Sequence, residues 1–263
     1  MSTNKLKTIG ITGGICSGKS TMMNYLRELI TEHETLQTKQ QSSSSEANTH
    51  SNVPLIHFHI IPTDELGWKA YEVDTPCYHQ VIEAFGSLVK EKLGEDPSLL
   101  VDAQTRQINR RVLGRIVFKD QQLMKKLTDI VWPEIRRLIE IEMKKAEDMA
   151  TENYKVVCLI EAAVLVEADW QHGIDQVWVI DVSNVNDRLE RLCKRNNLTL
   201  EEAQDRVNAQ LSTSEILQKL KEHNEKTNEQ VESVYVDTFG KSLEQVKEIA
   251  RDLFQTKVIG DWK

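Results

Sequence analysis

The chain has 263 residues, with 33 basic and 41 acidic side chains and a formal charge of −8. Its 40% apolar content and four widely separated cysteines exclude collagen-like chains, disulfide scaffolds and fully disordered proteins. The net negative charge argues against a general nucleic-acid binder, because phosphate backbones are held by broad basic surfaces. No apolar run reaches the roughly 18 residues that spanning a bilayer requires, and the polar start lacks the apolar region of a cleavable signal. We therefore expect a cytoplasmic protein with no nucleic-acid or membrane partner.

The first part of the chain predicts a strand, a glycine-rich loop and a helix. Residues 6–11 mix β-branched and apolar side chains, and from residue 19 the apolar positions recur three and four apart, as on one face of a helix. Residues 32–54 are polar and predict a flexible insertion, because so few apolar side chains cannot offset the entropy of ordering. The apolar run at 55–61, ended by Pro62, predicts a second strand.

The remainder of the chain alternates between helical and strand patterns. Residues 64–150 are expected to be helical throughout, with Pro133 at the first position of a helix. Capping-box patterns at Thr199–Glu202 and Ser242–Gln245 predict two later helix starts. Three further strands are predicted, at 155–160, 176–180 and 234–236. Near-continuous apolar strands separated by helices indicate a parallel sheet covered on both faces.

A phosphate-binding loop is the strongest functional signal. Residues 13–20 read GGICSGKS and fit G-x-x-x-x-G-K-[ST] between an expected strand and an expected helix. Glycines let backbone N–H groups turn toward phosphate oxygens, and the helix N-terminus adds its positive dipole end. Lys19 would neutralise charge on the β- and γ-phosphates of ATP, and Ser20 would place its hydroxyl on Mg²⁺. The alternative is a chance match in a turn. The candidate nucleotide-binding residues are Gly13, Gly14, Ile15, Cys16, Ser17, Gly18, Lys19, Ser20 and Thr21.

Beyond the loop, the sequence resembles the dephospho-coenzyme A kinase family. The motifs that carry the resemblance are TDELGWKAY at 63–71, EAFG at 83–86, INRRVLG at 108–114, VWP at 131–133, EAAVLVE at 161–167 and AQDRVNAQ at 203–210. In this order they are specific, and they look closest to the kinase half of the fused animal coenzyme A synthases. The resemblance implies transfer of the γ-phosphoryl group of ATP to the 3′-hydroxyl of the ribose of dephospho-CoA, the last step of coenzyme A synthesis.

The resemblance also implies an α/β P-loop kinase fold, with a five-stranded parallel sheet flanked by helices. In addition to the flexible insertion at 32–54, the expected parts are a core at 5–31, 55–62 and 154–260, a helical CoA-binding (acceptor) domain at 64–150 and a lid at about 188–230.

Asp64 is the candidate general base. A hydroxyl acceptor needs a carboxylate to orient it and take its proton, and Asp64 follows the expected second strand and matches the second aspartate of the family's D-x-D motif. The alternative is that Asp64 only caps the following helix. Pro62 stands where the family has the first aspartate, near the metal, and Glu161, which aligns with another family acid, could compensate as a Mg²⁺ ligand.

The resemblance further implies acceptor contacts from Arg110 and Glu167. Trp68 is expected to pack in a core or on an apolar helix face, with a contact to the pantetheine arm as the alternative. Thr238 stands where the family has an asparagine bordering the adenine pocket.

Arg191 and Arg195 are the candidate catalytic arginines of the lid. They are four residues apart and so project from one helix face, from which they could close over the phosphoryl group and exclude water. The alternative is a solvated charged face.

Two other functions stay open at this point: a kinase of another nucleoside or nucleotide, and a non-catalytic nucleotide-binding protein. Because the chain lacks the nucleotidyltransferase signature of the fused enzymes, we expect it to perform the last step alone, and it could associate with a separate pantetheine-phosphate adenylyltransferase.

Overall fold

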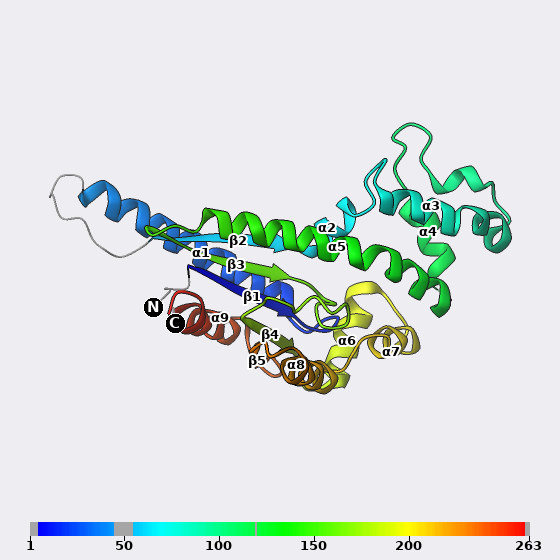
Figure 1. The fold of residues 1–263 in the computed structure, drawn as a ribbon. Helices are drawn as coiled ribbons and strands as arrows, with labels where there is room; N and C mark the ends of the chain where they lie inside the picture. Colours follow the sequence, from blue (N-terminus) through cyan, green and yellow to red (C-terminus); the bar gives the residue numbers. More distant parts are fainter. Residues whose placement is uncertain (1–4, 45–54, 119, 261–263) are drawn as a thin grey trace. The chain divides into compact units, whose positions relative to one another are not determined.

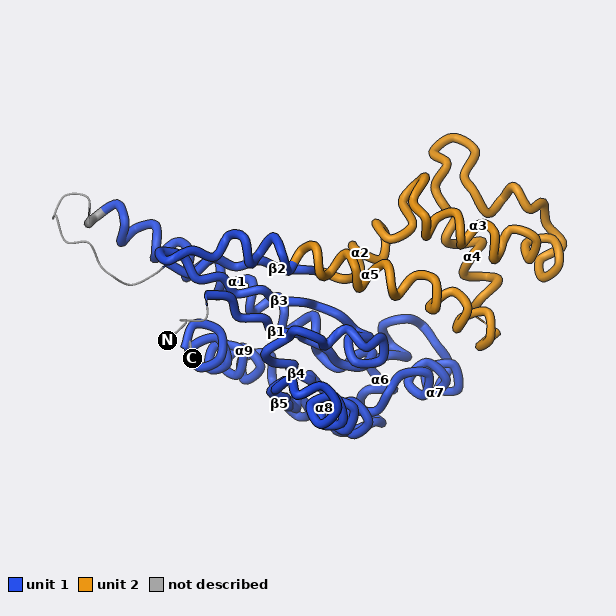
Figure 2. The backbone as a smooth tube through the Cα atoms, viewed as in Figure 1, with its two compact units in different colours: residues 1–61, 143–263 blue, residues 62–142 orange. Residues whose placement is uncertain are grey.

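The computed structural model describes residues 5–44, 55–118 and 120–260. The chain forms two compact units (Figure 2). Unit 1 contains residues 1–61 and 143–263, and unit 2 contains residues 62–142.

Unit 1 is built on a five-stranded parallel sheet (Figure 1). Its strands are β1 (Leu6–Thr12), β2 (Leu55–Pro62), β3 (Tyr154–Glu161), β4 (Gln176–Asp181) and β5 (Glu232–Asp237). Their order is β2-β3-β1-β4-β5, so β1 is central, and its Ile11 aligns with Glu161 on one side and Trp178 on the other. Residues 156–160 and all of β4 are buried, as a sheet covered on both faces requires. The five predicted strands and their parallel arrangement are confirmed.

Helices α1 (Lys19–Ser44) and α9 (Leu243–Leu253), with the short helix η3 (Phe254–Val258), form the main core with the sheet. Met22 and Met23 of α1 are fully buried in this core, beside Trp178 of the sheet and Phe254. An ion pair between Lys247 and Glu28, 3.0 Å long, joins α9 to α1 at the surface. Helix α1 therefore begins at the end of the glycine-rich loop and is held firmly against the sheet.

The prediction of a flexible insertion from residue 32 is wrong for residues 32–44, because α1 continues to Ser44. Its polar last turns are held by a tertiary contact: the side chain of Gln37 accepts from the N–H of Ile56 (2.8 Å) and donates to the carbonyl of Ile56 (3.0 Å). The hydroxyl groups of Thr35 and Thr38 also donate to carbonyls one turn earlier. Residues 45–54 of the predicted insertion lie outside the described residues.

Unit 2 contains α2 (Thr63–Lys69), α3 (Pro76–Leu88), η1 (Val89–Leu93), η2 (Pro97–Leu100), α4 (Arg110–Val117) and the first part of α5 (Gln121–Met149). Its buried side chains include Val81, Phe85 and Leu113. Pro133 lies inside α5 rather than at the first position of a helix. Proline removes one N–H from the helix ladder, and here the helix continues on both sides of it.

Three helices follow β4, namely α6 (Val185–Asn196), α7 (Leu200–Asn208) and α8 (Thr213–Thr227). The predicted capping boxes at Thr199–Glu202 and Ser242–Gln245 are confirmed, and a third, Ser212–Glu215, begins α8. Leu189, Leu192, Ala203 and Val207 form a small core between α6 and α7, against which Ile15 and Cys16 of the glycine-rich loop pack. The loop and these helices are thus in direct apolar contact.

Candidate phosphoryl-transfer site

The phosphate loop joins β1 to α1, and its backbone leaves little room for side chains. A Cβ atom on Gly13 would lie 2.2 Å from the carbonyl oxygen of Ile180 and 2.6 Å from Oγ of Ser17, so only glycine fits. Gly18 has φ +94°, in the region that favours glycine. Cys16 adopts φ +61° as a non-glycine residue, which makes the turn at this point tight. The N–H of Ser17 donates to the carbonyl of Gly14 over 3.1 Å.

Ser17 lies at the centre of the loop with its side chain buried. It is 1% exposed, and its Oγ has no hydrogen-bond partner within the described residues. A buried hydroxyl without a partner is costly, and it lies here beside the N-terminus of α1. The loop therefore fits a phosphate group, whose oxygens would accept from this hydroxyl and from the N–H groups of the helix end.

Lys19 and Glu161 meet next to the loop. Nζ of Lys19 lies 3.1 Å from Oε1 of Glu161, and Nη2 of Arg27 lies 2.9 Å from Oε2 of the same carboxylate. Glu161 is the last residue of β3, and the alignment of β3 with β1 brings it to the end of the sheet from which the loop starts. The structure thus brings together the predicted phosphate-binding lysine and the predicted metal ligand. Ser20 is exposed at the start of α1, and Thr21 is partly buried.

Arg188, which the sequence reasoning missed, lies beside the loop. A Cβ atom on Gly14 would lie 3.1 Å from its Nη1 atom, and the same atom lies 3.5 Å from Oδ1 of Asp181. Its side chain is 13% exposed, and its Nε atom is buried with no partner in the described part of the chain. The sequence signal that could have identified Arg188 is its spacing. It precedes Arg191 by three residues on the same helix, and residues three apart are neighbours on a helix surface.

The two predicted lid arginines make other contacts. Arg191 forms an ion pair with Asp187 over 2.8 Å. Arg195 is exposed and its Nε donates to the side chain of Asn196 over 3.0 Å. Neither contact involves the loop, so their catalytic roles stay predictions.

Gln210 also reaches the loop, with its Oε1 accepting from the N–H of Ile15 over 2.7 Å. It is the last residue of the AQDRVNAQ motif at 203–210, so the motif was noticed but no role was given to this side chain. Through Gln210 and Arg188, the helices after β4 place two polar side chains on the same part of the loop.

Thr238 contacts the loop from the turn after β5. It is 3% exposed, and its Oγ1 lies 3.0 Å from the carbonyl oxygens of Ser17 and Asp181. Oδ1 of the preceding Asp237 accepts from the N–H groups of Ser183 (3.1 Å) and Phe239 (2.9 Å). These contacts fix the turn after β5 beside the loop, where the sequence departs from the family's asparagine.

Glu167 lies in the connection between β3 and β4. Burial raises the pKa of its carboxyl group, while the N–H of Leu211 and the charge of Lys219 oppose that shift. Its Oε2 atom is buried and has no partner among the described residues. The contact with Leu211 places Glu167 beside the residue that follows Gln210.

In unit 2, Asp64 is exposed in the first turn of α2. Pro62 is the N-cap residue of this helix, and in the described part of the chain the Asp64 carboxylate makes no hydrogen bond or ion pair. The capping alternative is therefore not supported.

Arg110 lies over two aromatic rings of the same unit. Its guanidinium carbon is 4.6 Å from the ring centroid of Trp68 and 5.6 Å from that of Tyr71. Burial raises the pKa of Tyr71, and the charge of Arg110 opposes that shift. Trp68 is 61% exposed, so the prediction that it packs in a core is wrong. Stacking on Arg110 occupies one face of the indole and leaves much of it open to a ligand.

Comparison with known proteins decides the family. A family model for dephospho-CoA kinase matches residues 44–230. A dephospho-CoA kinase of Moorella thermoacetica is 31% identical over 77% of this chain and 75% of its own length. One from Staphylococcus saprophyticus is 30% identical over 78% of each chain. The chain belongs to the dephospho-CoA kinase family. ATP is accordingly the phosphate donor, and the expectation of a kinase is supported over that of a non-catalytic protein.

Solved structures agree with this fold. A dephospho-CoA kinase from Campylobacter jejuni superposes with a TM-score of 0.56 at 20% identity, over 95% of this chain and 96% of that one. A Thermus thermophilus protein gives the same TM-score at 22% identity, over 98% and 100%. The P-loop kinase fold that the resemblance implied is confirmed. Within the described residues of this family member, no helix is both long enough and apolar enough to cross a membrane.

Proposed function

We propose that this chain transfers the γ-phosphoryl group of ATP to the 3′-hydroxyl of the ribose of dephospho-CoA, with Mg²⁺ as the metal. The observation that carries the proposal is the phosphate loop with its buried, unpartnered Ser17 hydroxyl and its adjacent Lys19–Glu161 pair, in a chain of the dephospho-CoA kinase family. The loop binds the donor, and the family indicates the acceptor.

The donor is bound by the backbone and cations of the loop. N–H groups at the start of α1 and the Ser17 hydroxyl donate to the phosphate oxygens, and the helix dipole favours their negative charge. Lys19, now paired with Glu161, lies where its ammonium group can turn to the phosphates. Arg188 lies beside Gly14 and neutralises charge that develops as the γ-phosphoryl group moves.

Ser20 and Glu161 would hold Mg²⁺ together with the phosphates. Hydroxyl and carboxylate oxygens are the ligands this ion prefers. When bound, it would neutralise phosphate charge and help fix the in-line geometry of the transfer. Pro62 offers no oxygen from its side chain, so Glu161 is the protein carboxylate on which this site depends.

Asp64 would act as the general base. It follows β2 by two residues and matches the second aspartate of the family's D-x-D motif. Its carboxylate takes the proton of the 3′-hydroxyl as that oxygen attacks the γ-phosphorus. The bond from the γ-phosphorus to the bridging oxygen breaks, and ADP leaves with the bonding electrons.

Acceptor binding would rest on Arg110 and Trp68, with Glu167 as a further contact. The guanidinium group suits the acceptor's phosphate groups, and the exposed indole offers an apolar face to its pantetheine arm. Arg191 and Arg195 would close over the transferring group from the lid.

A coupled ADP-release assay with Mg²⁺-ATP and dephospho-CoA tests this proposal, with a no-acceptor sample as the blank. The Asp64→Asn variant should lose at least about 10²-fold in turnover, the lower end of what a general base contributes. Glu65→Gln is the matched control, since Glu65 is exposed in the same turn of α2. Full turnover of Asp64→Asn, or ATP binding without acceptor-dependent ADP release, would refute the assignment.

We also propose a cytoplasmic location and an association with a pantetheine-phosphate adenylyltransferase, whose product this kinase would consume. Co-elution of the two purified proteins at micromolar concentration would support the association, and separate elution would refute it.

A further inference from the structure

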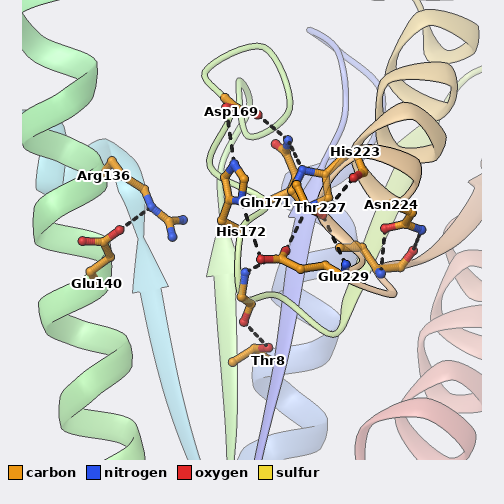
Figure 3. Close-up of polar contacts among 12 residues, drawn as sticks. Thr8, Arg136, Glu140, Asp169, Gln171, His172, His223, Asn224, Thr227 and Glu229 are labelled. Carbon is orange, nitrogen blue, oxygen red and sulfur yellow. Dashed lines mark hydrogen bonds and ion pairs between the residues drawn. The ribbon is translucent and has the colours of Figure 1, made fainter.

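Figure 3 shows a cluster of two histidines and two acids, Asp169, His172, His223 and Glu229. The cluster lies at the end of the sheet opposite the phosphate loop. Asp169 and His172 belong to the connection that leads into β4, His223 belongs to α8, and Glu229 precedes β5. In a parallel sheet, the residues that precede the strands lie at one end of the sheet, and the loops that follow the strands lie at the other end. The cluster is therefore separate from the nucleotide site.

The four side chains face one another. Oδ2 of Asp169 lies 3.4 Å from Nε2 of His172, and the other nitrogen of His172 lies 3.6 Å from Oε1 of Glu229. Nε2 of His223 lies 2.8 Å from Oε2 of Glu229. The imidazole rings are 4.5 Å apart between centroids. Each histidine thus turns one nitrogen toward Glu229, and the other nitrogen of His172 turns toward Asp169.

One ligand atom from each of Asp169, His172 and His223 lies within 4.8 Å of the others. Ligands of a tetrahedral zinc ion are about 3.3 Å apart, from bond lengths of about 2.0 Å. The ligand atoms would have to move about 1.5 Å closer to one another to reach this spacing. Side-chain rotation is enough for that movement, because the side chains of Asp169 and His172 are 72% and 40% exposed.

Gln171 gives an independent sign that the cluster lacks a partner. It is 3% exposed, its Nε2 donates to Oδ1 of Asp169 over 2.5 Å and lies 3.3 Å from Nδ1 of His223, and its Oε1 is buried with no partner among the described residues. The amide cannot be reversed, because its oxygen would then face the carboxylate. A cation, or water bound to a cation, would satisfy a buried acceptor on a side chain that contacts two of the candidate ligands, Asp169 and His223.

We propose that Asp169, His172 and His223 bind a divalent transition-metal ion, with Zn²⁺ as the best fit. His223 coordinates through Nδ1 once the amide nitrogen of Gln171, now 3.3 Å from that atom, moves aside, and His172 coordinates through Nε2, because the other nitrogen of each ring faces Glu229. Glu229 is the outer acceptor that orients both rings, as carboxylates commonly do for metal-bound histidines. Water completes the fourth position. Two imidazole ligands suit zinc and not magnesium, so this site differs in kind from the Mg²⁺ site of the kinase reaction.

The bound ion would link the β3–β4 connection to α8. The two segments come from opposite sides of β4 in the sequence, and joining them would stabilise the sheet edge rather than take part in phosphoryl transfer. The expected readouts are therefore metal affinity and thermal stability.

Isothermal titration of the full chain with Zn²⁺, after treatment with a chelator and without nucleotide, tests the proposal. We expect one Zn²⁺ per chain, a higher Tm with Zn²⁺ by mass action, and no binding of Mg²⁺ at this site. Co²⁺ titrated in the same way should give the visible absorption of a tetrahedral ion. Buried His223 is left intact, so that a folding defect does not obscure the result.

Asp169→Asn and His172→Ala should each weaken Zn²⁺ binding at least tenfold, and Glu229→Gln by about 10- to 100-fold. His79→Ala, an exposed histidine of unit 2, and Cys193→Ser, a partly exposed thiol, are the controls and should bind as the unaltered chain does. Absence of saturable Zn²⁺ binding, wild-type affinity in Asp169→Asn and His172→Ala, or equal binding of Mg²⁺ would each overturn the proposal. Nucleotide turnover is not needed for any of these readouts.

Discussion

Replacing Arg188 with alanine is the sharpest test of how the loop and the helices after β4 cooperate. The guanidinium group lies beside Gly14 and is 13% exposed, so its charge is only weakly screened. At an effective dielectric constant of about 20, a unit charge about 4 Å from a phosphate oxygen is worth up to about 4 kcal/mol. Part of this energy acts in ground-state binding, so we expect a loss of about 10 to 10² in turnover, which corresponds to about 1.4 to 2.7 kcal/mol.

The assay is acceptor-dependent ADP release, with turnover and the KM for ATP measured separately. Lys194→Ala is the matched control, because Lys194 lies on the same helix, is 75% exposed and pairs only with Glu190 among the described contacts. Arg188→Lys should recover a minor part of the activity, since an ammonium group keeps the charge but not the fork of donors. Thermal melting checks that the loss is not unfolding, because Asp181, 10% exposed, loses a cationic neighbour in the variant. If Arg188→Ala turned over like Lys194→Ala, the placement of Arg188 in the reaction would be wrong.

Three further outcomes follow from the described contacts. Glu161→Gln should raise the Mg²⁺ concentration needed for half-maximal turnover about tenfold or more; an unchanged Mg²⁺ titration would remove Glu161 from the metal site. Gln37→Ala should lower the free energy of unfolding by about 1 to 3 kcal/mol, because it leaves both polar backbone groups of Ile56 without their partner. Leu36→Ala, at a 58% exposed position, is its control in denaturant titration, and equal midpoints would refute the contact's importance. Burial, and next the charge of Glu134, raise the pKa of Cys77 to about 11. Only about one thiol in a thousand is then ionised at pH 8, so iodoacetamide should modify Cys77 more slowly than Cys193, as peptide mass mapping would show.

The strands and the phosphate loop were predictable because their determinants are local. Apolar runs of strand length alternate with helical spacing, and the loop needs glycine at fixed positions, as the 2.2 Å approach of a Gly13 Cβ to Ile180 demonstrates. The end of α1 was not predictable in this way. Its last turns are polar, and the contact that holds them joins Gln37 to a strand 19 residues away in the sequence. The spacing of apolar residues along the sequence does not reveal such a tertiary hydrogen bond.

The candidate site likewise contains residues with a local sequence signal and residues whose placement depends on tertiary packing. Lys19 and Ser20 were predicted from spacing, and Glu161 from its place at a strand end and its match to the family. Arg188 was missed in favour of Arg191 and Arg195, because a helical pattern gives relative directions around the axis but not which direction faces the loop. That direction depends on how Leu189 and Leu192 pack on α7, which is a property of the folded chain.

Packing between the loop and α6–α7 has a consequence for the reaction. Ile15 and Cys16 lie on the small core formed by those helices, and Gln210 accepts from the N–H of Ile15. A displacement of α6 and α7 therefore changes the environment of the loop. Conversely, a bound phosphate group that changes the conformation of the loop changes how stably these helices pack against it. Because coupling between two sites is reciprocal, ATP binding and the position of α6–α7 must be linked to the same extent in both directions. If Arg191 and Arg195 act as proposed, the same linkage would let the bound donor favour the arrangement in which they lie over the phosphoryl group.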